Sequence, residues 1–387
     1  MKKFQSKNKT TIISNQWYLL IALLTISFVS CKKEMAPISD EDEKVSAEKS
    51  INGGPHVVVK NGESIQSAID AAAAGTIIFI KSGTYSEAVH VEKPGIQLIG
   101  MNEGGRAVII QNPGTEENGI EVTSNGAGFV LKNVTVQNFK ENGVLLTGVD
   151  NFILDHVTAI NNKEYGLFPV FCHHGVIKYC SATGSSDTGI YVGQSTDISV
   201  QYNVAFANVS GFEIENCTNV EASFNESYDN TGGLLVFLLP GLTVKTASAI
   251  SVIKNYIHDN NRPNFSTPAG GFEFFVPTGS GILVVGADNT TIQKNRISHN
   301  NFVGVATVST LIIGSLAGLP AEAFADIEPN PDGTRITENT LTQNGSAAPA
   351  GLPLPAADFL WDGSGTNNCW SNNVYTTSFP GALPVCN

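Results

Sequence analysis

Apolar and polar residues alternate over short stretches that recur at an almost constant interval along the chain. In each stretch the residues one and three places after a glycine are apolar, as Val144 and Leu146 are after Gly143. Alternation with a period of two predicts a short β-strand with one buried face. The glycines recur every 22–24 residues, at Gly119, Gly143, Gly166, Gly189, Gly211 and Gly233. Such a period predicts a solenoid, in which each repeat forms one coil of a stack.

A second periodic position lies between these strands and is most often an asparagine. An asparagine tolerates a left-handed backbone, and its amide can hydrogen-bond to the coil below. The position holds Asn133, His156, Cys180, Asn203, Asn225, Asn255, Asn295 and Asn339. Three short strands and one such turn per coil predict an all-β fold, a right-handed parallel β-helix with about 22–24 residues per coil.

The pattern divides the chain into four regions. We expect a signal peptide over 1–31, a flexible tether over 32–54, the β-helix over 55–345 and a C-terminal capping tail over 346–387. Near the start of the β-helix, apolar residues between Ser64 and Ala74 have helical spacing, and Gly75 ends the stripe. A short capping helix there would protect the open edge of the first coil.

Three insertions, at 238–249, 262–280 and 309–333, interrupt the repeat. In solenoids such insertions form loops on one face, often the binding face.

The first 31 residues have the features of an export signal. Four lysines precede an apolar run from Trp17 to Val29, and Cys31 follows shortly after it. The segment Phe28-Val29-Ser30-Cys31 resembles the end of a bacterial lipoprotein signal, in which the cysteine is lipidated. We therefore expect an exported cell-envelope lipoprotein at the outer membrane, in contact with the membrane only through its lipid. The alternative is an ordinary cleaved signal peptide.

Charge and cysteine content narrow the choice of partners. The net charge of −13 argues against nucleic acid and disfavours a polyanionic substrate unless a cation lies between. Export favours disulfides, and we expect one between Cys369 and Cys386. The remaining cysteines after Cys31 are interpreted as stacking residues of the coils, namely Cys172, Cys180 and Cys217.

The strands that follow the glycines should have an outward face formed by the second and fourth residues. The second positions are Glu121, Leu145, Phe168, Tyr191, Glu213 and Leu235, and the fourth are Thr123, Thr147, Val170, Gly193, Glu215 and Phe237. Aromatic rings can stack on sugars, and carboxylates can act as acids and bases. The predicted substrate-binding residues are Phe168, Tyr191, Leu235 and Phe237, around Glu213 and Glu215 as catalytic carboxylates. The alternative is that an insertion or the tail buries this face.

Two further polar stacks are candidates for ionic chemistry. Glu141, Glu164 and Asp187 each lie two residues before a glycine, so they share a column. Carboxylates at strand spacing repel unless a cation binds, and Ca²⁺ is the expected ion; a solvated turn is the alternative. Arg262 borders the second insertion and is the candidate catalytic cation. The other polar stack, with a histidine between two aspartates, is Asp150, His174 and Asp197.

Several segments resemble a known group of proteins. They are Tyr165–Cys172, Asp187–Ser195, Gly211–Asn216, Gly232–Leu242 and Asn260–Phe265. They resemble exported parallel β-helix repeat proteins that are commonly paired with, or fused to, a cytochrome c-like protein. The resemblance covers most of 56–387 and implies the fold, export and a haem-protein partner. The chain has no C-x-x-C-H, so any haem belongs to that partner.

More distantly, the chain is similar to pectate lyases, alginate lyases and mannuronan C5-epimerases. The epimerases carry a Tyr-Gly-x-Asp-Pro-His stretch, which Tyr165, Gly166 and Pro169 match. Phe168 and Val170 replace its two ionisable residues, which argues against epimerase chemistry at that place.

The sequence thus leaves two functions open. In the first, a monomeric envelope protein binds carbohydrate polymers and, if enzymatic, cleaves them as a lyase or glycoside hydrolase. In the second, a non-enzymatic envelope scaffold acts with an exported cytochrome c-like partner. A β-helix hosts many functions, so the fold does not choose between them.

Overall fold

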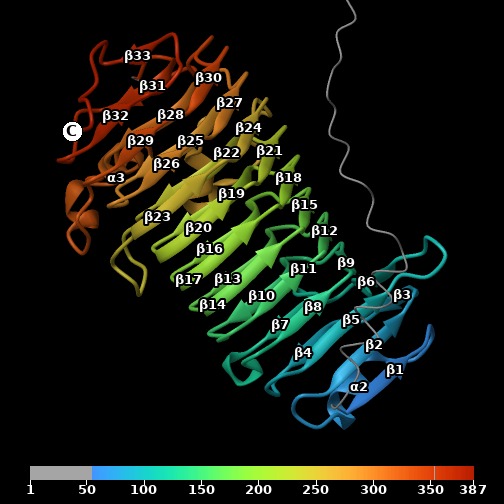
Figure 1. Cartoon of the computed structure of the whole chain (residues 1–387). Coiled ribbons are helices and arrows are strands. Elements are labelled where there is room, and N and C mark those ends of the chain that lie inside the picture. Colours follow the sequence, from blue (N-terminus) through green and yellow to red (C-terminus); the bar gives the residue numbers. More distant parts are fainter. Residues whose placement is uncertain (1–54, 353) are drawn as a thin grey trace, which may run out of the picture. The chain divides into compact units, whose positions relative to one another are not determined.

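The structure is a computed structural model that describes residues 55–352 and 354–387. The predicted signal peptide, the predicted lipidation site at Cys31 and the predicted tether lie outside the described residues. Three long parallel sheets run along the described part, and the strands of successive coils lie side by side from β1 to β32 (Figure 1). This arrangement confirms the predicted parallel β-helix.

Each regular coil contributes one strand to each sheet. The 12-stranded sheet contains β1 (His56–Val59), β2 (Ile77–Lys81), β5 (Gln97–Met101), β8 (Val130–Lys132), β11 (Ile153–Asp155), β14 (His173–Lys178), β17 (Thr196–Gln201), β20 (Thr218–Ser223), β23 (Ser248–Ile253), β26 (Thr291–Gln293), β29 (Arg335–Thr337) and β32 (Cys369–Ser371). The 11-stranded sheet contains β4 (Val89–Val91), β7 (Ile120–Val122), β10 (Asn142–Thr147), β13 (Tyr165–Val170), β16 (Thr188–Gly193), β19 (Ser210–Glu215), β22 (Gly232–Phe237), β25 (Ser280–Val285), β28 (Val303–Val308), β31 (Ala357–Trp361) and β33 (Ser378–Phe379). The 10-stranded sheet contains β3 (Gly83–Ser86), β6 (Val108–Gln111), β9 (Val134–Gln137), β12 (Thr158–Ile160), β15 (Ser181–Thr183), β18 (Val204–Phe206), β21 (Glu226–Tyr228), β24 (Tyr256–His258), β27 (Arg296–Ser298) and β30 (Thr340–Thr342).

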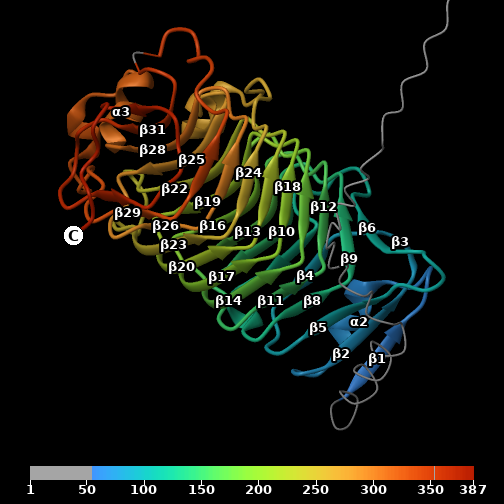
Figure 2. The ribbon, with the colours of Figure 1, turned by 45° about the horizontal axis from the view of Figure 1, so that its top comes forward.

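The predicted capping helix is α2 (Ile65–Ala71). Ser64 begins it by accepting a hydrogen bond from the backbone amide of Ser67. Ile65 and Ile69 are buried against the first coil, so the helix closes the apolar interior at this end (Figure 2). Shortly after this helix, Gly83–Ser86 forms strand β3, which pairs with β6.

An internal asparagine ladder runs through the coils. The side-chain amide of each member donates to the side-chain oxygen of the next at 3.0 Å. The ladder consists of Asn203, Asn225, Asn255, Asn295, Asn339 and Asn373, with Cys180 at its start. The prediction was wrong for Asn133 and His156, which lie one residue outward in left-handed backbone at φ 55°. The left-handed position directly precedes the buried ladder position, and spacing along the sequence does not separate the two.

A second internal ladder was not predicted. It lies five residues after the first in every coil and consists of Asn208, Asn230, Asn260, Asn300 and Asn344. All five are at most 9% exposed. The two asparagine ladders bind backbone groups at two corners of each coil, where the chain leaves one sheet and the hydrogen bonds between strands are interrupted.

The left-handed position beside the first ladder has an aromatic stack on the outside. His156, Tyr179, Tyr202 and Phe224 stack face to face with ring centroids 4.8–5.2 Å apart. Lys254 lies 5.0 Å from the centroid of the Phe224 ring and covers its free face. The facing surfaces of neighbouring rings are therefore occupied by one another within the stack.

The C-terminal region contributes further strands to the sheets. β31 and β32 pair in register with β28 and β29, so the chain adds strands to two sheets before it ends. A disulfide joins Cys369 and Cys386. Cys172, Cys180 and Cys217 are free and buried inside the coils. In the described part of the chain, no helix has the length and apolar character needed to span a membrane.

Candidate functional site

The outward column of the 11-stranded sheet forms in the predicted register. Leu145 pairs with Glu121 and Phe168, Tyr191 pairs with Glu213, and Glu213 pairs with Leu235. The fourth positions follow the same register, so Glu215 lies between Gly193 and Phe237. The structure therefore brings Phe168, Tyr191, Glu213 and Glu215 onto neighbouring strands.

Burial along this column increases from the N-terminal to the C-terminal coils. Glu121, Leu145 and Phe168 are half-buried. Tyr191 and Glu213 are each 5% exposed, and Leu235 is fully buried. The outer face is thus open over β7, β10 and β13 and closed from β22 onward.

Three segments close the C-terminal half of this face. We call them the lid: η2 (Pro268–Phe275), α3 (Thr310–Leu316) and the segment 346–352 with 354–356. The first two come from two of the predicted insertions. Leu352 and Leu354 of the third segment pack against the sheet, and so do Phe272 of η2 and Ile312 of α3. A further short helix, η3 (Ala321–Phe324), packs against α3 and buries Phe324.

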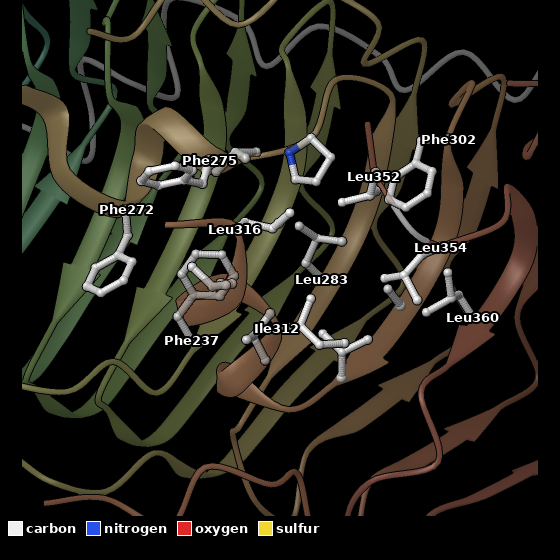
Figure 3. A pocket seen from close by; sticks show the side chains of 16 residues that line it. Phe237, Phe272, Phe275, Leu283, Phe302, Ile312, Leu316, Leu352, Leu354 and Leu360 are labelled. Carbon is white, nitrogen blue, oxygen red and sulfur yellow. The ribbon is translucent and has the colours of Figure 1, made fainter. Parts of the chain in front are cut away.

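The lid buries part of the predicted binding surface. Leu235 and Phe237 are 0% and 1% exposed, so their prediction as substrate-binding residues was wrong. They belong to a second apolar cluster between sheet and lid, because outward apolar side chains there are covered by apolar side chains of the insertions. An apolar cavity of about 40 Å³ remains in this layer, and Phe237, Leu283 and Ile312 are among its lining residues (Figure 3).

A cluster of carboxyl groups lies where the open face meets the lid. One carboxylate oxygen from each of Asp187, Glu213 and Glu273 lies within 4.8 Å of the others. Thr188 Oγ1 donates to Glu213 Oε2 at 2.7 Å and is 3.1 Å from Asp187 Oδ1. Ser210 donates to Glu273, which η2 brings down onto the sheet. Glu213 and Glu273 are buried and Asp187 is half-buried, so Asp187 is the member most open to solvent.

Glu215 extends the cluster along β19 and is bound by Tyr191. The Tyr191 hydroxyl donates to Glu215 Oε2. A Cβ at Gly193 would lie 2.1 Å from the Tyr191 hydroxyl oxygen, so the tyrosine ring reaches Glu215 only because that position has no side chain. Glycine at this one position thus fixes the direction of Tyr191.

Three aromatic rings border the carboxyl groups on the open side. Tyr165 stacks on Phe168 with centroids 4.2 Å apart, and Tyr191 meets both rings edge-on at 5.2 and 4.8 Å. Tyr165 and Phe168 are half-buried, so part of this aromatic group faces solvent. Together these rings form an apolar platform next to hydrogen-bonding carboxyl groups.

Burial and mutual repulsion favour the neutral forms of these carboxyl groups and raise their pKa values. Burial raises the pKa of Asp187 to about 7; hydrogen bonds from Tyr165 and Thr188 oppose this, and the charges of Glu215 and Glu164 add to it. Burial, and after it the charge of Glu273, raises the pKa of Glu213 well above its ordinary value. The pKa values of Glu215 and Glu273 are also raised, in both cases mainly by burial.

No basic side chain offsets these effects. None of the ion pairs in the described part of the chain involves Asp187, Glu213, Glu215 or Glu273. In such a group of interacting carboxyls one member can act as an acid while another acts as a base.

The predicted calcium ligands form a column, but their carboxylate oxygens do not converge on one point. Backbone hydrogen bonds link Glu141, Glu164 and Asp187 in successive coils. The groups whose oxygens converge in the described residues do not include Glu141 or Glu164, because Asp187 turns to Glu213 and Glu273 instead. A second convergent group consists of Asp288, Glu328 and Asp332.

The predicted cationic residue is engaged elsewhere. Arg262 Nη2 lies 2.6 Å from Asp229 Oδ2, and its Nε donates to the Asp229 carbonyl oxygen at 3.0 Å. Its assignment as a catalytic residue has no geometric support, because the guanidinium pairs with Asp229 and with none of the clustered carboxyl groups. Lys245 pairs with Asp326.

His174, the histidine of the second polar stack, also lies next to carboxylates. The two ring nitrogens of His174 lie 2.8 Å from Asp150 and 3.6 Å from Asp197. The hydrogen bond that the protonated ring donates to the Asp150 carboxylate raises the pKa of this exposed histidine.

Sequence reasoning missed Glu273 and the role of Asp187 beside it. Glu273 lies in an insertion with no repeat to align, 60 residues after Glu213 in the chain. The available signal was a single acidic residue within the apolar run Gly271-Phe272-Glu273-Phe274-Phe275. An isolated carboxyl group in such a run is either exposed or paired at a buried site.

Sequence comparison identifies the class of protein. The family model described as "Right handed beta helix region" matches residues 95–238 and 237–374. The chain therefore belongs to the right handed beta helix region family. Comparison of the sequence with curated proteins finds no match.

Solved structures share the fold at low identity. The A-module of mannuronan C-5 epimerase AlgE6 from Azotobacter vinelandii is 18% identical with a TM-score of 0.58, over 81% of this chain and 90% of that one. The AlgE4 A-module from the same organism is 18% identical with a TM-score of 0.56, over 84% and 92%. DFA-IIIase from Arthrobacter chlorophenolicus A6, in complex with GF2, is 13% identical with a TM-score of 0.50, over 87% and 96%. At such identities these similarities establish the fold alone.

Proposed function

We propose that this protein binds a carbohydrate chain on the open part of the 11-stranded sheet and cleaves it at the carboxyl cluster. The observation that carries the proposal is the position of Asp187, Glu213 and Glu215 beside the rings of Tyr165 and Phe168. Aromatic faces suit the apolar faces of sugar rings, and paired carboxyl groups suit acid–base cleavage of a glycosidic bond.

Asp187 is the proposed general acid. A pKa of about 7 places it where a carboxyl group is substantially protonated at neutral pH, and it is reachable from solvent. As Asp187 protonates the leaving oxygen and the glycosidic bond breaks, a water molecule must attack the anomeric carbon, and a second, ionised carboxyl group of the protein must take the proton of that water. Glu215 is half-buried on the next strand and is proposed for this role, with Tyr191 holding its orientation. Glu213 and Glu273 are buried deeper in the same cluster, beside Asp187.

The substrate is proposed to be neutral. The site collects carboxyl groups without a partnering cation among the described residues, and the chain is acidic overall. A polyuronate would add further negative charge to this place. Two of the structural neighbours are named for mannuronan, which supports carbohydrate as the ligand class without specifying which one.

The test is to incubate the purified protein with a panel of neutral and acidic polysaccharides. Reducing-end release and the ultraviolet absorbance of unsaturated sugar ends are followed together. We expect reducing ends without absorbance on a neutral polymer, and a loss of roughly 10²–10⁴-fold in Asp187→Asn. The matched control is Asp70→Asn, an exposed aspartate on α2. No release from any polymer, or unchanged release by Asp187→Asn, contradicts the proposal.

We also propose export and anchoring by a lipid on Cys31, on the strength of the signal-like segment before it. Expression of the full chain should place it in the membrane fraction, and Cys31→Ser should release it. Equal membrane association of both proteins would rule out the lipid anchor.

The cytochrome c-like partner stays a prediction from resemblance. Co-purification under mild crosslinking from the native envelope, read by haem absorbance, is its test.

A further inference from the structure

We infer that the site acts at the ends of saccharide chains, because the lid closes the binding face immediately beyond Glu213. This inference rests on the proposed function and adds its mode of action. It follows from which coils are open, which are covered and where the carboxyl cluster lies between them.

The closed side is formed by contacts on consecutive coils. Ser210 on β19 donates to Glu273 of the lid. A Cβ at Gly232 on β22 would lie 2.9 Å from Val276 Cγ1, so the chain that follows η2 lies directly on this strand. Further along, Leu283 on β25 is only 6% exposed. No coil adjoining the cluster on this side leaves its outward position free.

The lid is packed as an apolar layer. Phe272, Ile312 and Leu354 contact a cluster of buried residues on β22, β25, β28 and β31. Lifting the lid would expose this whole cluster to water, at roughly 25 cal/mol for each Å² of apolar surface. The lid therefore acts as a wall for a chain lying on the sheet.

The open part of the face extends from the cluster only toward the N-terminal coils. From Glu213 the outward column passes Tyr191, Phe168, Leu145 and Glu121 to His90 on β4. His90 is exposed, and Phe168, Leu145 and Glu121 are half-buried. The open part, from His90 to Phe168, is a track that covers three strand spacings of about 4.8 Å, or roughly 14 Å, and Glu213 lies two spacings beyond Phe168, past the buried Tyr191. A chain lying on this track has its terminus at the wall, so the bond at the carboxyl cluster is close to a chain end.

The first test uses the polymer that the panel identifies, a linear oligosaccharide of the same linkage and a cyclic one that has no ends. We expect a mono- or disaccharide from the earliest time points, little loss of viscosity while reducing ends rise, and resistance of the cyclic substrate. A ladder of intermediate sizes, an early fall in viscosity or comparable cleavage of the ring overturns end-specific action and leaves the proposed function standing. Absence of all cleavage removes both.

The second test separates the track from the cluster. Leu145 lies three strands from Glu213, so Leu145→Asp should raise KM for long chains roughly tenfold and leave the shortest cleaved oligosaccharide unaffected. Leu311→Asp, on the exposed side of α3, is the matched control, since Leu311 is 38% exposed. Equal effects of Leu145→Asp on long and short substrates, or no effect on either, would show that no chain lies on this track.

Discussion

Glu273 of the lid accepts a hydrogen bond from Ser210 on β19, 63 residues earlier in the chain. This contact brings a third carboxyl group to Asp187 and Glu213 and fastens the lid at the edge of the open face. One insertion therefore shapes both the electrostatics of the site and the surface that a ligand can reach.

The carboxyl cluster predicts that stability falls with rising pH. The pKa of Asp187 is about 7 in the folded chain against an ordinary value of 3.8, so the folded state binds more protons between these values. The free energy of unfolding should therefore decrease as pH rises from about 4 to about 7, by up to about 4 kcal/mol. Denaturant titrations at pH 4, pH 5 and pH 8 follow this decrease.

Asp187→Asn provides the check on this pH dependence. An amide does not titrate, so the variant should be more stable than wild type at pH 8 and have a flatter profile. Glu221→Gln, an exposed carboxyl on the 12-stranded sheet, should leave the profile as it is. A variant at Asp187 with the wild-type profile would show that this carboxyl is already ionised at pH 5.

Gly193→Ala should detach Tyr191 from Glu215. The new Cβ would lie 2.1 Å from the tyrosine hydroxyl oxygen, so the ring must rotate away. We expect about 1–3 kcal/mol of destabilisation and at least a tenfold loss of cleavage, because Glu215 loses the group that orients it. Thermal unfolding and reducing-end release measure the two effects. Gly381→Ala, where a Cβ meets nothing within 4 Å, should match wild type; wild-type activity in Gly193→Ala would exclude a role for the Tyr191–Glu215 contact.

The asparagine ladder predicts a large cost for a small substitution. Asn255 accepts from the backbone and the side chain of Asn225 at 2.9 and 3.0 Å, and donates to Ala222 and Asn295. Asn255→Ala leaves these buried partners unsatisfied, which should reduce the free energy of unfolding by roughly 2–4 kcal/mol in urea titrations. Asn219→Gly, at an exposed left-handed position, should change it by about 0.5 kcal/mol or less. Equal effects of the two would mean that the ladder contributes no stability.

The apolar layer beneath the lid should behave as a true core. Leu283 is 6% exposed there, so Leu283→Ala should cost roughly 2–5 kcal/mol. Leu311 is 38% exposed on α3, and Leu311→Ala should cost much less. If calorimetry gives similar losses for both variants, the lid does not seal this face.

The repeat made much of the fold predictable. Alternation around Gly143, Gly189 and Gly211 correctly placed the outward columns, because the side chains of a strand alternate between its two faces. The same reasoning misassigned Asn133 and His156, since a shift of one residue moves a side chain from the inside of a corner to the outside. The ladder that starts at Asn208 has a constant offset from the first and was available from spacing alone.

The repeat in the sequence predicted only part of the site. Tyr191, Glu213 and Glu215 come from the repeat and meet as their register requires. Glu273 comes from an insertion, whose path over the sheet depends on packing between residues far apart in the chain. The burial of Leu235 and Phe237 depends on the same packing.

By itself the sequence determined the coil, the three sheets and the direction in which each strand residue points, because these follow from local periodicity repeated in register. Only the tertiary structure decided which part of the outer face is open, since the covering segments share no period with the strands beneath them. It also decided the protonation of the carboxyl cluster, because a pKa depends on burial and on neighbouring charges that the fold brings together.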